Sequence, residues 1–272
     1  MGNSRPTLGC IGFGNMGRAL MLGVQRHPEL HARYALLAYD AHAPCRGAAG
    51  DAGLPVAESA GALAGDASVI LLAVKPYQVA DVLRAIAPVL GPEKLLLSIA
   101  AGVRLDSLKR DSGGRCQVVR VMPNTPALVG QGIFGLCFAD DVSSEQREQA
   151  RWLFSRLGRT LELPESKMNA FTALSGSGPG YIFHFMESLA EAGVSAGLDR
   201  RDSQAIVLAL LKGCAIMAEE TGQHPAVLRE QVSSPAGTTI AGLNHLDRCG
   251  ARGQIVDAVL AAKARGEAMD GE

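Results

Sequence analysis

A glycine-rich turn near the start of the chain limits its fold more than any other stretch. Residues 11–17 read IGFGNMG, and an apolar run at residues 8–11 leads into them. After the turn, apolar residues recur at the spacing of an amphipathic helix. A strand, a G-x-G-x-x-G turn and a helix in this order are typical of domains that bind a dinucleotide.

Each glycine of the turn has its own role in such a site. Gly12 allows the sharp turn, Gly14 leaves room for a pyrophosphate against the backbone, and Gly17 lets the helix pack closely on the strand. The first N–H groups of the helix then face the phosphates, with the positive end of the helix dipole behind them. A glycine-rich turn without a ligand is the alternative, and the flanking strand and helix favour the dinucleotide site.

An acidic residue follows at the position where such domains contact the adenosine. Residues 34–39 predict a second strand, which ends at Asp40. A carboxylate at this point accepts hydrogen bonds from the ribose and repels a 2′-phosphate, so Asp40 favours NADH. An aspartate in a polar loop fits the pattern equally well. Arg46 lies near enough in sequence to weaken the preference for NADH.

Later apolar runs predict the remaining strands. Continuous apolar runs suit parallel strands that are buried on both faces, and ligands in such sheets lie at the carboxyl ends of the strands. Ser143 and Gln146 predict a capping box that starts a helix over 144–157. The predicted strands cover residues 68–74, 94–100, 117–122, 133–138 and 159–163, with a short one at 54–57.

From residue 166 onward the pattern changes to long helical stripes, and strand-like runs disappear. We therefore predict two domains, 1–164 and 165–272, of which the second is all-helical. The stripes of this second domain are uniformly apolar, which predicts that they bury a face against another subunit.

Two glycine-rich loops interrupt the helical part. Residues 175–181 read SGSGPGY and residues 233–239 read SSPAGTT, and each leads into a helical stripe. Hydroxyls and free N–H groups at a helix start form a receptor for a small anion such as a carboxylate. An ordinary Ser/Thr cap would account for one hydroxyl but not for the cluster.

Composition excludes several classes of function. The formal net charge is −1, so the composition does not indicate a basic face for nucleic acid. The six cysteines are scattered, without the spacing of a disulfide framework or a metal site, and this usage fits a reducing compartment. No apolar run is long enough to span a membrane, and residues 1–6 lack a secretory h-region. We expect a cytoplasmic protein with no metal, no membrane and no nucleic-acid partner.

The motifs together resemble those of Δ1-pyrroline-5-carboxylate reductases, and they span nearly the whole chain. The family usually has Ala where Gly180 stands, and Gly where Ala236 stands. The matching stretches are IGFGNMG (11–17), AVKP (73–76), SIAAGV (98–103), RVMPNTPALV (120–129), ALSGSGPGY (173–181), ETGQHP (220–225) and SSPAGTTIAGL (233–243).

The resemblance implies a fold, a reaction and an assembly. The fold is an α/β Rossmann-type dinucleotide-binding domain followed by an all-α dimerisation domain like that of 6-phosphogluconate dehydrogenase. The reaction is hydride transfer from NADPH or NADH to the C=N carbon of Δ1-pyrroline-5-carboxylate, which gives L-proline. The assembly is a homodimer or a higher homo-oligomer.

The resemblance also assigns residues to the two ligands. Thr239 is implied as the catalytic residue, because its hydroxyl would contact the ring nitrogen of the substrate. The other implied substrate-binding residues are Glu165, Ser234, Ala236, Gly237 and Thr238. The implied cofactor-binding residues are Ile11, Gly12, Phe13, Gly14, Asn15, Met16, Ala73, Val74, Lys75, Pro76, Ile99, Ala100 and Ala101. The dinucleotide-binding pattern adds Gly17 and Asp40 to the predicted cofactor site.

Two alternatives come from other classes. A β-hydroxyacid dehydrogenase would share this domain plan, and so would an imine-reducing oxidoreductase with a different substrate. The former depends on a helical lysine, and the two lysines early in the helical domain, Lys167 and Lys212, do not lie in that family's motif. A non-catalytic cofactor-binding protein would not need the loop at residues 233–239.

Overall fold

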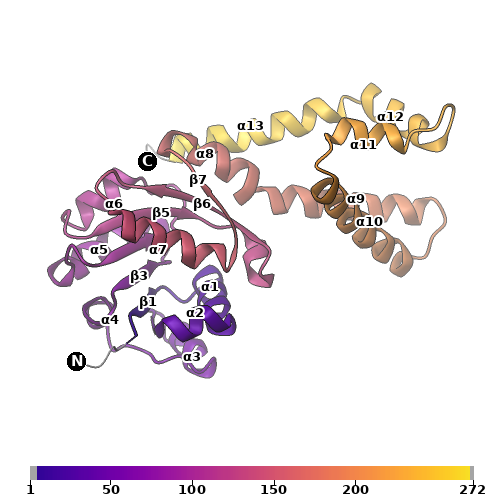
Figure 1. Ribbon diagram of the computed structural model, residues 1–272. Coiled ribbons are helices and arrows are strands. Elements are labelled where there is room, and N and C mark those ends of the chain that lie inside the picture. The colour runs from indigo at the N-terminus through magenta and orange to yellow at the C-terminus, as the bar shows by residue number, and fades with distance from the viewer. Residues whose placement is uncertain (1–4, 270–272) are drawn as a thin grey trace. The chain divides into compact units, whose positions relative to one another are not determined.

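The computed structural model describes residues 5–269, which form two compact units (Figure 1). Unit 1 contains the described residues up to Gly176 together with those from Lys263 onward, and unit 2 contains Ser177–Ala262. Unit 1 extends past residue 165 because Met168 and Phe171 are buried in it. The division into domains at residues 164 and 165 stays a prediction.

Unit 1 is built on a seven-stranded sheet with the order β2-β1-β3-β4-β5-β6-β7. Neighbouring strands from β2 to β5 are parallel, β6 is antiparallel to β5, and β7 is parallel to β6. The strands are β1 (Thr7–Ile11), β2 (Ala35–Tyr39), β3 (Val69–Leu72), β4 (Leu95–Ser98), β5 (Gln117–Met122), β6 (Gly132–Phe138) and β7 (Gly158–Glu162).

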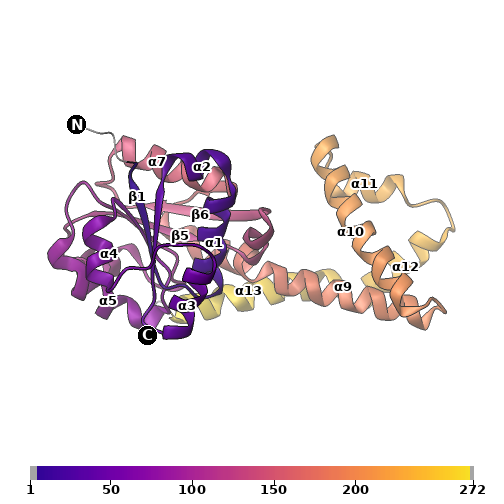
Figure 2. The same cartoon turned by 90° about the horizontal axis from the view of Figure 1, so that it is seen from below.

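Helices cover both faces of the parallel strands. Figures 1 and 2 show α1 and α2 on one side of the strands, and α4 and α5 on the other. The helices of unit 1 are α1 (Asn15–Arg26), α2 (Pro28–Arg33), α3 (Ala43–Asp51), α4 (Ala60–Asp66), α5 (Val79–Ile86), α6 (Leu105–Asp111), α7 (Ser144–Ser155) and α8 (Met168–Phe171). Short 3-10 turns lie at Pro76–Gln78, Ala87–Val89, Thr125–Val129 and Glu165–Lys167, and a π-helical turn lies at Thr172–Gly176.

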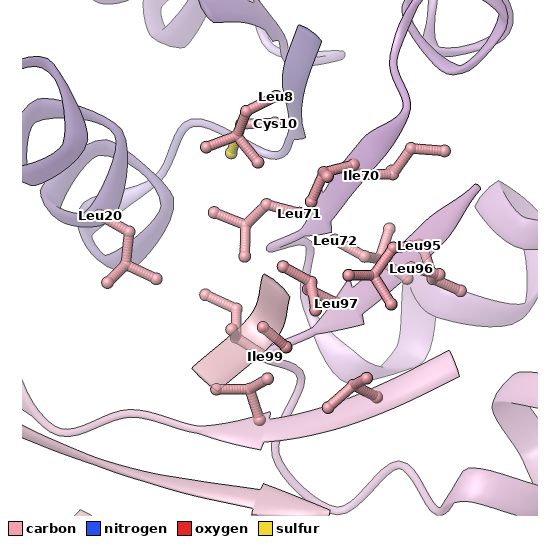
Figure 3. Packing of buried hydrophobic residues seen from close by; sticks show 14 of the residues in the cluster. Leu8, Cys10, Leu20, Ile70, Leu71, Leu72, Leu95, Leu96, Leu97 and Ile99 are labelled. Atoms are coloured by element: carbon pink, nitrogen blue, oxygen red, sulfur yellow. The ribbon is translucent and has the colours of Figure 1, made fainter. Parts of the chain in front are cut away.

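The core lies between these layers and is mainly aliphatic. Every residue of β3 and β4 is buried, as expected for parallel strands that are covered on both faces. Figure 3 shows leucines of both strands, such as Leu71 and Leu97, packed toward Leu8 of β1 and Leu20 of α1. This packing holds the carboxyl ends of the central strands in fixed positions.

Two local predictions were wrong in part. Residues 54–57 form only an isolated bridge between Ala38 and Val56, in which Pro55 O accepts from Ala38 N. Pro55 has no N–H to donate, which does not favour a longer ladder. The capping box is half formed: Ser143 Oγ accepts from Gln146 N at 3.2 Å. However, Ser143 N donates to Oε1 of Gln117 instead of to Gln146.

Unit 2 is all-helical, as predicted. It contains α9 (Gly178–Ser195), α10 (Arg200–Thr221), α11 (Pro225–Gln231), α12 (Thr238–Arg248) and the start of α13 (Ala251–Met269). Helices α9 and α10 pack on each other, and the hydroxyl of Ser203 donates to Ala190 O at 2.6 Å. Large apolar side chains on both helices nevertheless stay exposed in this chain, among them Phe183 and Leu208. Within residues 5–269, no helix combines the length and apolarity that a membrane span requires.

Candidate active site

The strand order of the sheet reverses direction at β1. Strand β2 lies on one side of β1 and β3 on the other, and Ile11 is level with Tyr39 of β2 and Leu72 of β3. The crevice at the carboxyl ends of strands on either side of such a reversal is where open α/β sheets bind ligands. The glycine turn at residues 11–17 begins at this point.

Geometry at two of the glycines excludes any side chain. Gly12 has a φ of +99°, and a Cβ there would lie 2.6 Å from the carbonyl carbon of Ala73. A Cβ at Gly17 would collide with the carbonyl oxygen of Gly12. Both glycines therefore let α1 and the β3 loop approach the turn closely. In contrast, a Cβ at Gly14 would meet no protein atom within 4 Å.

The start of α1 has donors that no side chain caps. Gly14 is the N-cap residue, it makes no side-chain cap bond, and the first turn of the helix contains no acidic residue. The N–H groups of this turn and the positive end of the helix dipole thus face the open space above Gly14. This arrangement suits a phosphate group.

A cavity of about 510 Å³ lies at this point, and we call it the switch-point cavity. It brings together most of the residues predicted for the cofactor, from the glycine turn, the end of β2 and the loops after β3 and β4. They are Ile11, Gly12, Gly14, Asn15, Met16, Asp40, Ala73, Val74, Lys75, Pro76, Ile99, Ala100 and Ala101.

Two of the predicted cofactor residues, Phe13 and Gly17, are not among those that line it. The side chain of Phe13 is buried in the core, and Gly17 packs against Gly12 instead. Sequence reasoning missed further lining residues for which no motif exists. These are Tyr39, Ala41, His42, Cys45, Ala60, Gln78 and Val82. Only their nearness in sequence to Asp40 or to Pro76 could have indicated His42, Cys45 and Gln78.

Asp40 fixes the shape of the cavity through its carboxylate. Oδ2 accepts from Phe13 N at 2.6 Å, and Oδ1 accepts from His42 N at 2.8 Å. Arg46 contacts the same loop, because its Nη1 donates to the carbonyls of Asp40 and Ala41 at 2.7 and 2.8 Å. The carboxylate keeps acceptor capacity for a ribose, because its two oxygens offer about four lone-pair sites.

Cys10 of β1 also stabilises the glycine turn through a hydrogen bond. Its Sγ lies 3.2 Å from Gly12 O and donates a hydrogen bond to it. Burial, followed by the charge of Asp40, raises the pKa of the Cys10 thiol, which therefore stays protonated and able to donate.

In unit 2, the loop at residues 233–239 forms a tight turn before α12. Gly237 N donates to Ser234 O at 3.1 Å, and Ala236 between them has a φ of +54°, which a residue with a Cβ rarely adopts. Gly237 is the N-cap of α12 and makes no side-chain cap bond, and Thr238 and Thr239 are the first two helical residues. The exposed hydroxyls and the free N–H groups of this turn make a receptor for an anionic group.

Glu165, in unit 1, has partners of its own. One carboxylate oxygen accepts from Nη1 of Arg120 at 2.7 Å, and the carboxylate also accepts from Leu105 N, at 3.1 Å from the other oxygen. Arg120 is buried in β5, with a side chain that is 4% exposed. Glu165 therefore ties the segment after β7 to β5 and to the start of α6. Its contact with a substrate stays a prediction.

No metal centre is visible at either place. Among residues 5–269, no group of three or more His, Cys, Asp or Glu side chains has an arrangement that would hold a metal ion.

Comparison with known proteins decides the family. A family model described as "Pyrroline-5-carboxylate reductase dimerisation" matches residues 165–269, and one described as "NADP oxidoreductase coenzyme F420-dependent" matches residues 7–102. The chain is 40% identical over 264 residues to a pyrroline-5-carboxylate reductase of Pseudomonas aeruginosa, with 96% of each chain covered. The chain belongs to the pyrroline-5-carboxylate reductase family.

Other relatives agree with this assignment. The pyrroline-5-carboxylate reductase of Glycine max is 38% identical, and the match covers 95% of this chain and 94% of that protein. A crystal structure of Plasmodium falciparum pyrroline carboxylate reductase with NADP bound has a TM-score of 0.89 and 34% identity, and the match covers 99% of this chain and 100% of that one. These findings confirm the predicted family and a Rossmann-type sheet domain followed by an all-helical dimerisation domain.

Proposed function

We propose that this protein reduces Δ1-pyrroline-5-carboxylate to L-proline with NADPH or NADH. The observation that carries the proposal is the turn at residues 233–239, whose N–H groups and hydroxyls open α12 without a side-chain cap. We infer that this turn is the receptor for the carboxylate and the ring nitrogen of the substrate. A protein that only bound a cofactor would have no use for it.

The switch-point cavity fits a nicotinamide dinucleotide. Gly14 leaves space where the pyrophosphate would approach, the uncapped start of α1 supplies donors to it, and Asp40 supplies acceptors to the ribose. The backbone after β3 and β4, at Ala73–Pro76 and Ile99–Ala101, would line the nicotinamide side. The bound cofactor supplies the hydride that is transferred to the C=N carbon.

The chain's own residues would bind and orient the imine. Ser234, Ala236, Gly237 and Thr238 hold the carboxylate through backbone N–H groups and hydroxyls, and the Thr239 hydroxyl bonds the ring nitrogen. No lysine or arginine stands at residues 233–239, so hydrogen bonds rather than a side-chain cation recognise the carboxylate. A protonated imine is already electrophilic, so positioning and electrostatics account for most of the rate.

The same proposal covers the assembly and the compartment. Apolar side chains on α9 and α10, such as Phe183 at 63% and Leu208 at 60% exposure, would be covered by a second copy in a homodimer or larger homo-oligomer. All six cysteines are free thiols, which suits a reducing compartment such as the cytoplasm.

The test compares two substrate classes on the same preparation. Oxidation of NADPH and NADH is followed with pyrroline-5-carboxylate, and reduction of NAD⁺ and NADP⁺ is followed with 3-hydroxyisobutyrate. We expect turnover with the imine alone, and L-proline as its product. Turnover of the hydroxyacid would support the dehydrogenase alternative, and no turnover of either, with cofactor still bound, would support a cofactor-binding protein.

A further inference from the structure

A thiol and an imidazole lie together at the rim of the switch-point cavity. Cys45 is half-buried in the first turn of α3, and the exposed His42 is the N-cap residue of this helix. Sγ of Cys45 lies 3.7 Å from Nδ1 of His42. Both residues line the cavity beside Asp40, at the end where the adenosine ribose binds in such domains. The reduction proposed above gives neither of them a role.

The other five cysteines differ from Cys45 in burial or in place. Cys10, Cys116 and Cys137 are buried, and burial raises the pKa of the Cys116 and Cys137 thiols to about 11. These thiols stay protonated and shielded at neutral pH. Cys214 and Cys249 are exposed in this chain but belong to unit 2. Among the six, Cys45 alone lines the switch-point cavity.

We propose that Cys45 is a modification site, at which a small disulfide such as oxidised glutathione forms a mixed disulfide in competition with the adenosine end of the cofactor. The adduct would place a charged tripeptide at the cavity, which measures about 510 Å³ and is the space that the dinucleotide needs. Bound cofactor and bound glutathione therefore exclude each other.

The chemistry needs no group beyond these two residues and the disulfide. Nδ1 of His42 accepts the thiol proton, and the Cys45 thiolate attacks one sulfur of oxidised glutathione. A new sulfur–sulfur bond forms as the old one breaks, and one glutathione leaves as a thiolate that takes up a proton. Cys45 is oxidised, and one equivalent of glutathione is reduced.

The test measures adduct formation site by site. The protein is incubated with oxidised glutathione, with and without saturating NADP⁺, and each cysteine peptide is followed by mass spectrometry. We expect Cys45 to be modified, and NADP⁺ to slow its modification at least ten-fold. Cys249 is the internal control, because its Sγ also lies 3.7 Å from an imidazole nitrogen, Nε2 of His245, but it does not line the cavity. NADP⁺ should leave the rate at Cys249 unchanged.

A second arm measures the consequence for the cofactor. NADPH affinity of the wild-type protein should fall at least ten-fold after treatment with oxidised glutathione and recover with a reducing agent. The affinity of Cys45→Ser, compared before and after the same treatment, should not change. The proposal is overturned if Cys45 remains unmodified, if bound NADP⁺ does not slow its modification, or if Cys45→Ser loses affinity on treatment as the wild type does.

The inference rests on the cofactor assignment and not on imine reduction. A protein that binds NADP⁺ and shows this protection, yet does not turn over pyrroline-5-carboxylate, would retain the modification site and lose the proposed function. The two proposals therefore fail on different measurements.

Discussion

The backbone N–H of Phe13 donates to Oδ2 of Asp40 at 2.6 Å, which joins the glycine turn after β1 to the loop after β2. The other carboxylate oxygen accepts from His42 N at 2.8 Å. One carboxylate thus fixes two of the loops that shape the switch-point cavity. Its position at the end of β2 was predicted for a contact with the ribose, and this second, internal role was not.

This relationship predicts the effect of Asp40→Asn. Removing the charge weakens two hydrogen bonds that hold the cavity, and bonds to charged groups contribute roughly 1.5–3 kcal/mol each. We expect the affinity for NADH and for NADPH to fall about ten-fold or more together, as measured by titration of protein fluorescence. The ratio of the two should also shift toward NADPH by on the order of 1 kcal/mol, because a charge near the 2′-phosphate is lost.

Asp51→Asn is the control, since Asp51 ends α3, is exposed and does not line the cavity. Unchanged affinity for both cofactors in Asp40→Asn would show that the carboxylate does not hold the loops. An equal loss of affinity for NADH and NADPH, with no shift in their ratio, would show that the Asp40 carboxylate does not discriminate between the two cofactors.

A pair of glycine variants separates folding from cofactor binding. Gly14→Ser places a favourable N-cap residue at a φ of −72° and in open space, so the melting temperature should stay the same or rise. The new side chain occupies the approach of the pyrophosphate, so NADPH affinity should fall at least ten-fold. Gly12→Ala should instead lower the melting temperature, because of its φ of +99° and its close approach to Ala73.

Calorimetry and NADPH titration of both variants make the comparison. Full NADPH affinity in a folded Gly14→Ser protein would place the pyrophosphate elsewhere.

Much of the fold was predictable because its signals are local. The strand at Gln117–Met122 has the predicted bounds, since turn signals lie on both sides of it, Gly113-Gly114 before and Pro123-Asn124 after. Prediction failed where a distant residue competes for a backbone group. Ser143 N bonds to Gln117, 26 positions away, and this left the capping box half formed. No pattern within a short window carries that information.

The residues of the candidate site also differ in whether a short motif could predict them. The glycine turn and the ends of β3 and β4 were found from motifs, because each motif is a short run of the chain. His42 and Cys45 have no motif of their own and reach the cavity through the geometry of the loop after β2. Glu165 was assigned to the substrate by resemblance alone, and its ion pair with Arg120, 45 positions away, appears only in the folded chain.

Thr239→Ala tests the substrate turn. Removing its hydroxyl deletes a hydrogen bond to a charged group, and this should lower kcat/KM for pyrroline-5-carboxylate about ten- to a hundred-fold. NADPH affinity should be nearly unchanged, because the switch-point cavity is intact. Thr238→Ala is the matched control, one residue earlier in α12, and should cost less. An unaltered kcat/KM in folded Thr239→Ala would place the ring nitrogen in a different loop.

Ala236→Gly tests the strain in the same turn. Ala236 has a φ of +54°, and a left-handed conformation costs a residue with a Cβ roughly 1–2 kcal/mol. Glycine, which the family usually has here, removes this cost but loses about 0.5–1 kcal/mol more backbone entropy on folding than alanine. The unfolding free energy should therefore rise by about 0.5–1 kcal/mol. Ala241→Gly, inside α12, is the same change in a helical position and should lower it by about 1 kcal/mol. Equal destabilisation in both variants would mean that Ala236 is not strained.

Isotope transfer tests the central claim most directly. The protein is incubated with pyrroline-5-carboxylate and NADPH that carries deuterium in the transferable position at C4, and the product is analysed by mass spectrometry and NMR. If residues 233–239 hold the imine and the switch-point cavity holds the cofactor for hydride transfer, the product is L-proline with one deuterium on the former C=N carbon. Proline without deuterium at that carbon, or no proline from protein that binds NADPH, would contradict the account.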